Sequence, residues 1–441
     1  TNRSVYCFIG QSSTMPMRWS KRWNWTACCR SRASIRTTSS PAPIRLNKSV
    51  ESVTWLGSDN DLQPRSRESL DVQTHASLER NAGSINDFAN SIRAMRRHEI
   101  ERIGLGWMSG VIDDKASLAG MTDVYDAAID ASLTWAIRHQ TQEMGLDEAP
   151  AAIAVIGMGR YGGREVNFSS DADVIIIYRP SDNADDNQAN LFARKVQEDL
   201  RAILQGPTTL EPKIELDMDL RPEGKNGPLV RSYASCEEYY RSWASTWEHQ
   251  ALLRARYAAG DAALAEDFLM NVADPLRYPK IDLTEAQVAE IRKLKARMEA
   301  ERLPRGVRRD RHLKLGKGGL SDVEWTIQLL QLQHAGDNAN LRVNGTMQAL
   351  DELERRKLVS AGDAVVLRRA WWMCTAARNG SYLWSGRHNQ ADILPDDTYS
   401  LGGLAVYLGY DANRGQHFEN DLLAVMRKAR DVTERLFYGL S

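Results

Sequence analysis

The sequence predicts an α+β protein in which a mixed-sheet core is followed by an all-α helical bundle. Two apolar runs with the character of β-strands flank a glycine turn between Ile153 and Tyr178. Amphipathic helical patterns precede this block, and beyond Gly260 the chain reads almost entirely as helix. We therefore expect four regions: a leader at 1–49, a helical region at 50–145, the sheet core at 146–262 and the bundle at 263–441.

The composition is that of an ordinary globular protein. The 441 residues suffice for two or three domains, with 42% of them hydrophobic and 26% charged. The formal net charge is -1, whereas a surface built for duplex nucleic acid is usually basic, so we expect no nucleic-acid partner. No apolar run approaches the length of a membrane span, and the five cysteines form no CxxC pair. We expect a cytoplasmic protein without a membrane partner.

The leader at 1–49 differs from the rest of the chain. It contains nine Arg and Lys residues but no Asp or Glu, and it has neither helical nor strand periodicity. We expect this segment to be disordered or non-native, so the function should lie in the residues that follow it.

The elements after the leader follow from hydrophobic periodicity and capping residues. The segment 213–220 reads as a short strand. Ser235 and Glu238 match a capping box, which predicts a helix that runs to about Ala259. Other helices are expected at 85–103, 124–137, 188–204, 284–302, 321–335, 345–357, 361–384 and 415–438.

The glycine turn invites a dinucleotide-binding interpretation, which the spacing excludes. Gly157, Gly159 and Gly162 satisfy the pattern G-x-G-x-x-G. Such a fold needs a helix of ten or more residues before the next strand. Here the next strand starts about nine residues after Gly162, too soon for that crossover.

A pair of aspartates, Asp171 and Asp173, stands at the start of the second strand. Residues i and i+2 of a strand point to the same side, so the two carboxylates leave one face together, and such oxygen ligands suit Mg²⁺. A third carboxylate is expected from the strand at 213–220, where Asp217 and Asp219 share a side and either could be the ligand. Three carboxylates are typical of two-metal phosphoryl transfer, so we predict a metal–phosphate site.

The turn before the aspartates offers further contacts for a nucleotide. Backbone amides at Gly157 and Gly159 could approach a phosphate closely, and Ser169 or Ser170 could add a hydroxyl donor. The simpler alternative is a tight turn that only reverses the chain.

The turn at 221–228 supplies two basic candidates for nucleotide contact, Arg221 and Lys225. The alternative for Arg221 is an ion pair with Asp217 or Asp219 at the end of the preceding strand.

Several motifs, in order along the chain, resemble one family. Gly-Met-Gly-x-x-Gly-Gly-x-Glu from Gly157, followed by Ser-Ser-Asp-x-Asp, is similar to the signature of the DNA polymerase beta nucleotidyltransferase superfamily. The form of this signature resembles that of the glutamine synthetase adenylyltransferase family. Further matches to that family lie at 61–67, 219–230, 246–256 and 314–325. The resemblance runs from about residue 50 to the C-terminus, and 1–49 matches nothing in the family.

The resemblance implies a DNA polymerase beta-like core that transfers AMP from ATP to a tyrosine hydroxyl of glutamine synthetase, with Mg²⁺ as cofactor. It implies that Asp171 and Asp173 bind the catalytic metals. The family pattern Val-Asp-Leu-Arg-Leu-Arg-Pro places its aspartate at Asp217, and many members have arginine at the position of Asp219. Asp217 is therefore the implied third ligand, and its carboxylate could also accept the tyrosine proton.

The resemblance also bears on the direction of the reaction. The family has one half that attaches AMP and a related half that removes it by phosphorolysis. This chain contains one such core, and Trp247–Arg256 resembles the C-terminal, adenylylating half. The segments 171–173 and 301–306 resemble the actinobacterial branch. Glutamine synthetase is the implied partner, and a PII-type signal protein is a second candidate.

The sequence leaves three other functions open: the adenylyl-removing half, a uridylyltransferase of a PII-type protein, and a non-catalytic regulatory module that binds nucleotide. The role of the basic stretch from Arg302 to Lys317 is also open. It could hold the triphosphate, contact an acidic face of the substrate enzyme, or form a solvated loop.

Overall fold

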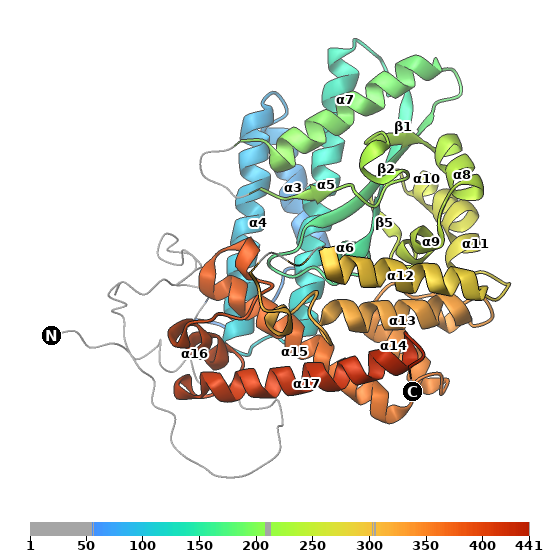
Figure 1. The fold of residues 1–441 in the computed structure, drawn as a ribbon. Helices are drawn as coiled ribbons and strands as arrows, with labels where there is room; N and C mark the ends of the chain where they lie inside the picture. The colour runs from blue at the N-terminus through green and yellow to red at the C-terminus, as the bar shows by residue number, and fades with distance from the viewer. Residues whose placement is uncertain (1–54, 56, 208–212, 302, 304–305, 441) are drawn as a thin grey trace.

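The computed structural model describes residues 55, 57–207, 213–301, 303 and 306–440. The predicted leader at 1–49 lies outside these residues. Figure 1 shows the sheet and its covering helices in the upper half of the molecule and the helical bundle below them.

The first helices whose bounds the structure describes are α3 (Arg67–Arg80), α4 (Ile85–Met108) and α5 (Asp114–Glu143). Each begins after a residue whose side chain accepts a hydrogen bond from the first turn, namely Ser66, Ser84 and Asp113. The apolar sides of these helices and of α7 (Asp186–Gln205) pack against one face of the sheet. The N-terminal helices therefore share a core with the sheet and do not form one of their own.

In the described part of the chain the sheet has five strands: β1 (Ala151–Gly157), β2 (Ala172–Pro180), β3 (Leu216–Asp217), β4 (Val230–Ser232) and β5 (Arg256–Gly260). β1 is antiparallel to β2 and β5, whereas β2 is parallel to β3 and β4. The sheet is mixed, which confirms the predicted α+β class. β1 and β2 are buried along most of their length because helices cover both faces.

The second face of the sheet is covered by α8 (Tyr233–Ser242), α10 (Ala262–Asp267), the π-helix η3 (Phe268–Ala273) and the short helix α11 (Asp274–Arg277). The prediction of one helix from Ser235 to Ala259 is wrong. Helix α8 begins after the N-cap Ser232, and a separate helix α9 (Thr246–Leu252) begins at a capping box formed by Ser245 and Glu248. Residues 256–260 form β5 because the free edge of β1 offers them a hydrogen-bonding partner.

The strand predicted at 213–220 is shorter than expected. Only Leu216 and Asp217 join the ladder, beside β2. The chain then turns through Asp219–Gly227, where successive backbone hydrogen bonds, such as Arg221 N to Met218 O at 3.1 Å, replace strand pairing.

The bundle packs around its own apolar core. Five of its helices match the predicted ones to within two residues at each end. The sequence does not indicate α16, because Gly402 and Gly403 weaken its helical signal. The bundle helices are α12 (Glu285–Glu301), α13 (Leu320–His334), α14 (Thr346–Arg355), α15 (Ala361–Ser385), α16 (Thr398–Tyr407) and α17 (Gly415–Leu436).

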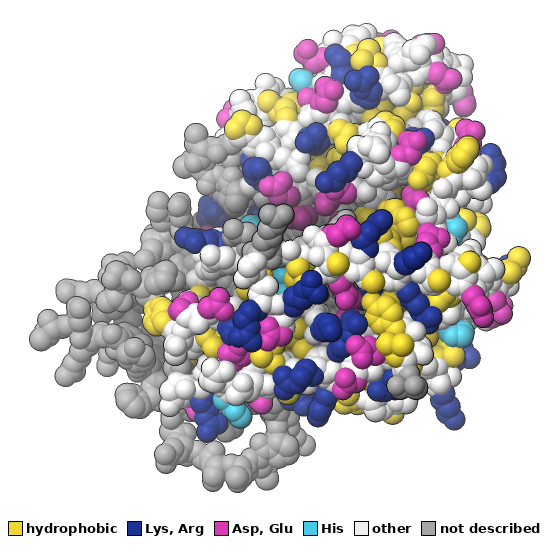
Figure 2. All heavy atoms as spheres, viewed as in Figure 1, with side chains coloured by type: hydrophobic (Ala, Val, Ile, Leu, Met, Phe, Trp, Pro, Cys, Tyr) yellow, Lys and Arg dark blue, Asp and Glu magenta, His cyan; other side chains and the backbone are white. Residues whose placement is uncertain are grey.

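On the face drawn in Figure 2, Lys and Arg side chains are interspersed with Asp and Glu, in keeping with the formal net charge of -1. Within the described ranges, no helix combines the length and the apolar character needed to cross a bilayer.

Candidate active site

The parallel strands β2 and β3 bring two aspartates together. Asp173 and Asp217 are the second of the two register pairs in this ladder, and Asp171 precedes Asp173 by two residues. Neighbouring strands lie about 4.8 Å apart, so the side chains of Asp173 and Asp217 originate from adjacent backbone positions at the same end of the sheet.

Asp219 has a different environment. It lies beyond the end of β3, is exposed, and forms ion pairs with Lys225 at 3.3 Å and with Arg221 at 3.9 Å. Its backbone N–H donates to Oδ1 of Asp217 at 2.7 Å, which holds the Asp217 carboxylate in place. The ion pair predicted as an alternative for Arg221 is therefore present, and it involves Asp219.

The carboxylates of the site disfavour one another's charged forms. Burial raises the pKa of Asp173 to about 7, and Asp217 and Asp171 add to this shift while Lys314 opposes it. Partial desolvation and Asp217 also raise the pKa of Asp171, again against Lys314. A divalent cation would relieve this repulsion, so the donor set fits Mg²⁺ in charge and in ligand type.

The fit to Mg²⁺ rests on the carboxylate pairs Asp171–Asp173 and Asp173–Asp217. In the part of the chain that the structure describes, no three His, Cys, Asp or Glu side chains converge closely enough to hold one ion.

The glycine turn packs directly against Asp173. Gly159 has a φ of +52°, and a Cβ at this position would collide with the Oδ2 atom of Asp173. The backbone N–H of Met158 donates to the carbonyl of Asp173 at 2.8 Å. Gly157 ends β1 opposite Val174. In this conformation the two glycines position Asp173 and the start of β2.

The serine hydroxyls before Asp171 bond within their own loop. Both Ser169 and Ser170 donate to Oδ1 of Asn167, at 3.2 and 2.8 Å. The carbonyl of Ser170 accepts a hydrogen bond from Tyr125 of α5 at 2.9 Å. Ser170 is buried, so here it fixes the path of the chain into Asp171.

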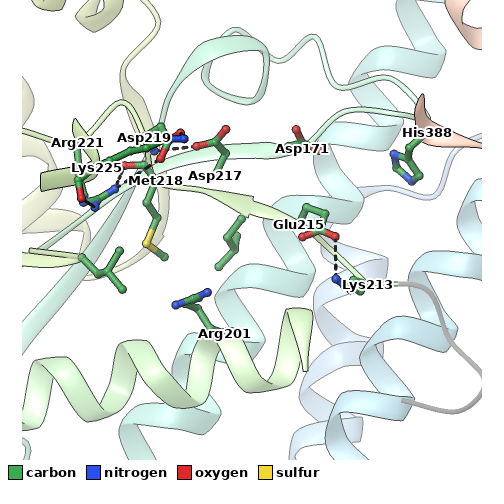
Figure 3. A pocket seen from close by; sticks show the side chains of 12 residues that line it. Asp171, Arg201, Lys213, Glu215, Asp217, Met218, Asp219, Arg221, Lys225 and His388 are labelled. Atoms are coloured by element: carbon green, nitrogen blue, oxygen red, sulfur yellow. Dashed lines mark hydrogen bonds and ion pairs between the residues drawn. The ribbon is translucent and has the colours of Figure 1, made fainter. Parts of the chain in front are cut away.

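An open pocket of about 970 Å³ lies beside β3. Figure 3 shows Asp171, Asp217 and Asp219 along one rim, with Arg201 reaching from α7 on the opposite side. Of the residues predicted for the site, the pocket lining contains Asp171, Asp217, Asp219, Arg221 and Lys225. Asp173, Gly157, Gly159, Ser169 and Ser170 are not part of the lining.

The two basic residues predicted for nucleotide contact differ in this pocket. Arg221 is buried and donates to the carbonyls of Met218, Gly227 and Lys225 at 2.7, 3.0 and 3.2 Å. It therefore shapes the turn that borders the pocket. Lys225 is exposed at the rim, where its ammonium can reach a bound anion.

Sequence reasoning missed four polar residues of the pocket: Arg201, Lys213, Glu215 and His388. Arg201 is an ordinary surface position of an amphipathic helix, and His388 is a single histidine in the connection between α15 and α16. Neither has a local sequence signal. Lys213 and Glu215 lie on the predicted strand and form an ion pair at 3.3 Å.

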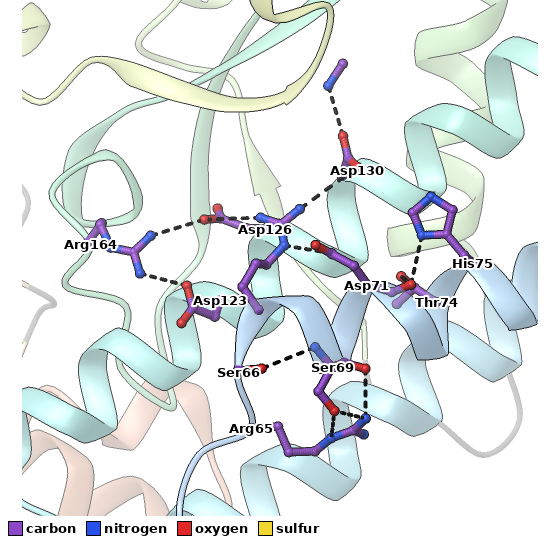
Figure 4. Close-up of polar contacts among 12 residues, drawn as sticks. Arg65, Ser66, Ser69, Asp71, Thr74, His75, Asp123, Asp126, Asp130 and Arg164 are labelled. Carbon is purple, nitrogen blue, oxygen red and sulfur yellow. Dashed lines mark hydrogen bonds and ion pairs between the residues drawn. The ribbon is translucent and has the colours of Figure 1, made fainter.

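Ion pairs connect the glycine turn to its surroundings. Figure 4 shows Asp123 and Asp126 of α5 facing Arg164, at 2.7 and 3.5 Å. Asp126 also accepts from Arg256 of β5 at 2.7 Å, and Arg256 donates to the carbonyl of Tyr161 at 3.2 Å. These contacts fix the turn to α5 and β5.

The bundle contacts the same turn from the other side. Arg160 pairs with Glu324 of α13 at 3.3 Å. Glu165 accepts hydrogen bonds from the hydroxyl of Thr346 at 2.8 Å and from its backbone N–H, and it pairs with Arg254 at 3.5 Å. Arg254 and Arg256, at the end of the run Trp247–Arg256, thus contact residues of the glycine turn.

Residues 31–271 match the family model described as glutamate-ammonia ligase adenylyltransferase. The chain belongs to this family. The match begins at residue 31, so the prediction that 1–49 resembles nothing in the adenylyltransferase family is wrong for 31–49. Residues 289–437, which cover most of the bundle, match the model described as GlnD PII-uridylyltransferase.

The chain is also similar to curated members of the adenylyltransferase family. It is 79% identical over 394 residues to a protein of Bifidobacterium longum (strain DJO10A), covering 89% of this chain and 37% of the relative. A protein of Leifsonia xyli subsp. xyli is 42% identical (89% of this chain, 38% of the relative), and one of Streptomyces avermitilis is 40% identical (90% and 41%). All three are named bifunctional glutamine synthetase adenylyltransferase/adenylyl-removing enzyme. The chain spans about two fifths of the length of these relatives.

Proposed function

We propose that this chain is the adenylylating part of such an enzyme and transfers AMP from ATP to a tyrosine hydroxyl of glutamine synthetase in the cytoplasm. The observation that supports this most directly is the register pairing of Asp173 with Asp217, beside a pocket lined by Asp171 and several basic residues. Carboxylates on neighbouring strands of a mixed sheet are the arrangement expected of a DNA polymerase beta-like nucleotidyltransferase, which is the fold we propose for the core.

Asp171, Asp173 and Asp217 would hold the Mg²⁺ ions. When bound, these ions neutralise charge on the phosphates and on the attacking and leaving oxygens. The chain itself supplies positive charge at the pocket: Arg201, Lys213 and Lys225 line it and are suited to bind phosphate oxygens.

Asp217 is also the proposed acceptor of the tyrosine proton. Its Oδ1 receives the N–H of Asp219, while the carboxylate lines the open pocket where a hydroxyl could approach. A carboxylate positioned in this way can act as a general base. Gly157 and Gly159 position Asp173, and Ser169 and Ser170 fix the loop that carries Asp171.

The evidence for the proposed direction of the reaction comes from the sequence. Attachment and removal of AMP use the same metals, so the aspartates do not distinguish them. The resemblance of Trp247–Arg256 to the adenylylating half supports attachment, and the adenylyl-removing reaction is the alternative.

The bundle supports a second proposal. Its match to the uridylyltransferase model suggests a PII-type signal protein as a partner that contacts the bundle. Uridylyl transfer to such a protein is the corresponding alternative activity.

Incubation with Mg²⁺ and ATP labelled at the α-phosphate tests these proposals. Label should appear on unmodified glutamine synthetase, and the Asp173→Asn variant should give none. Release of ADP from adenylylated glutamine synthetase and phosphate, without labelling, would reverse the direction. Labelling of a PII-type protein by UTP would favour the uridylyltransferase, and ATP binding without any transfer would favour a regulatory module.

A further inference from the structure

The loop before α13 has a backbone that leaves little room for movement. Gly318 has a φ of +73°, and a Cβ there would collide with the backbone carbonyl of Met426 on α17. The backbone N–H of Gly318 donates to Oδ2 of Asp322 at 2.7 Å. The loop is therefore pressed directly onto a bundle helix.

Asp322, in the first turn of α13, links this loop to α12 and α17. Its carboxylate pairs with Lys295 of α12 and, at 3.1 Å, with Arg430 of α17. Asp322 and Lys295 are both almost fully buried, so this network is shielded from solvent. Three bundle helices thus hold one short loop.

Lys314 is presented by this loop. Its carbonyl accepts from Ser321 N at 2.9 Å, and its N–H donates to Nδ1 of His312 at 3.3 Å. The preceding residue, Leu313, donates to the carbonyl of Asp392 at 2.8 Å. The backbone of Lys314 is therefore fixed on both sides while its side chain is exposed.

The loop of Lys314 lies against the segment that carries His388 to the pocket. His312 forms a β-bridge with Ile393, and His388 lines the pocket together with Asp171. Burial raises the pKa of both Asp171 and Asp173, and the Lys314 ammonium is the largest influence that opposes this shift. Among the described residues, no ion pair joins this ammonium to a carboxylate. Two other cations of the same stretch are engaged: Arg308 pairs with Asp310, and Arg311 is buried against Glu419.

We propose that Lys314 is a residue of the nucleotide site contributed by the bundle, and that its ammonium binds the β- or γ-phosphate of ATP. This inference rests on the proposed function. Without ligands the ammonium balances the charge of the aspartates. Once cations bind those carboxylates, Lys314 is free to pair with phosphate oxygens. The bundle would then complete a site whose carboxylates come from β2, β3 and the residue before β2.

The test compares Lys314→Ala, Lys314→Arg and the wild type, with Lys428→Ala on α17 as the control for loss of an exposed bundle lysine. Equilibrium binding of ATP and of AMP is measured with Mg²⁺, alongside the melting temperature. Lys314→Ala should weaken ATP binding by about 10- to 100-fold, the scale of a charge-assisted contact, and AMP binding by less than about threefold. Lys314→Arg should retain part of the ATP affinity, and Lys428→Ala should bind both nucleotides like the wild type.

Several results would overturn the inference. Equal losses for ATP and AMP would mean that Lys314 acts on the fold or on the aspartates and not on the outer phosphates. An equal loss of ATP affinity in Lys317→Ala would mean that the stretch acts only by its general positive charge. Unchanged ATP affinity in Lys314→Ala would exclude the contact, whereas absence of AMP transfer by a wild type that binds ATP would refute only the proposed function.

Discussion

Asp173 and Asp217 stand opposite one another on the parallel strands β2 and β3, although the whole of helix α7 separates them in the chain. The pairing makes Asp217 the neighbour of the aspartate pair and leaves Asp219 outside the ladder, bound to Lys225. The two acidic residues of the same short segment therefore have different expected roles.

The first prediction ranks these two aspartates. Asp217→Asn should lower the turnover of AMP transfer by at least about 100-fold, the scale of a lost general base or metal ligand. Asp219→Asn should cost much less, because it removes an exposed ion pair. Steady-state kinetics of both variants measures the ranking, and the reverse order would mean that Asp219 is the third carboxylate.

The second prediction concerns the contact between the glycine turn and Asp173. Gly159→Ala places a methyl group against Oδ2 of Asp173 at a residue with positive φ, so Asp173 must move. AMP transfer should fall by at least about tenfold, because small displacements of catalytic groups are costly. Gly83→Ala is the control, since a Cβ there has nothing within 4 Å. Normal turnover in Gly159→Ala would show that the position of Asp173 tolerates the shift.

The third prediction is a pH dependence of Mg²⁺ binding. Because the pKa of Asp173 is raised to about 7, its carboxyl is protonated and neutral below that pH in the metal-free protein. Mg²⁺ requires the carboxylate, so its affinity should rise with pH up to about 7 and level off above, with release of a proton. Calorimetry in buffers of different ionisation enthalpy measures both effects. Affinity that does not change between pH 5.5 and 7 would contradict the role of Asp173 as a ligand.

The fourth prediction tests the link between the glycine turn and the bundle. Glu165→Gln leaves the buried guanidinium of Arg254 without its counter-charge, which should lower the free energy of unfolding by about 3 kcal/mol. Glu79→Gln removes an exposed ion pair with Arg138 and should have little effect. Chemical denaturation of both variants gives the comparison, and equal stabilities would mean that Glu165 is not needed to hold the turn.

Much of the fold is determined by local sequence. Strand β1, the glycine turn and the aspartates at the start of β2 are recognisable because their patterns span only a few residues. The long helices of the bundle are equally plain, since each repeats its apolar positions over several turns. These features suffice for the α+β class and for the choice of Asp171 and Asp173.

Other features depend on contacts between distant segments. Residues 256–260 are a strand because the edge of β1 lies beside them, although the sequence continues a helical pattern. The placing of Asp217, and not Asp219, beside Asp173 is a matter of strand register, which local sequence does not encode. Arg201 and His388 reach the pocket from α7 and from the α15–α16 connection, and the proposed contact of Lys314 comes from the loop before α13. Only packing of the bundle and α7 around the sheet brings side chains from these distant segments together, so only the tertiary structure decides which of them line the pocket.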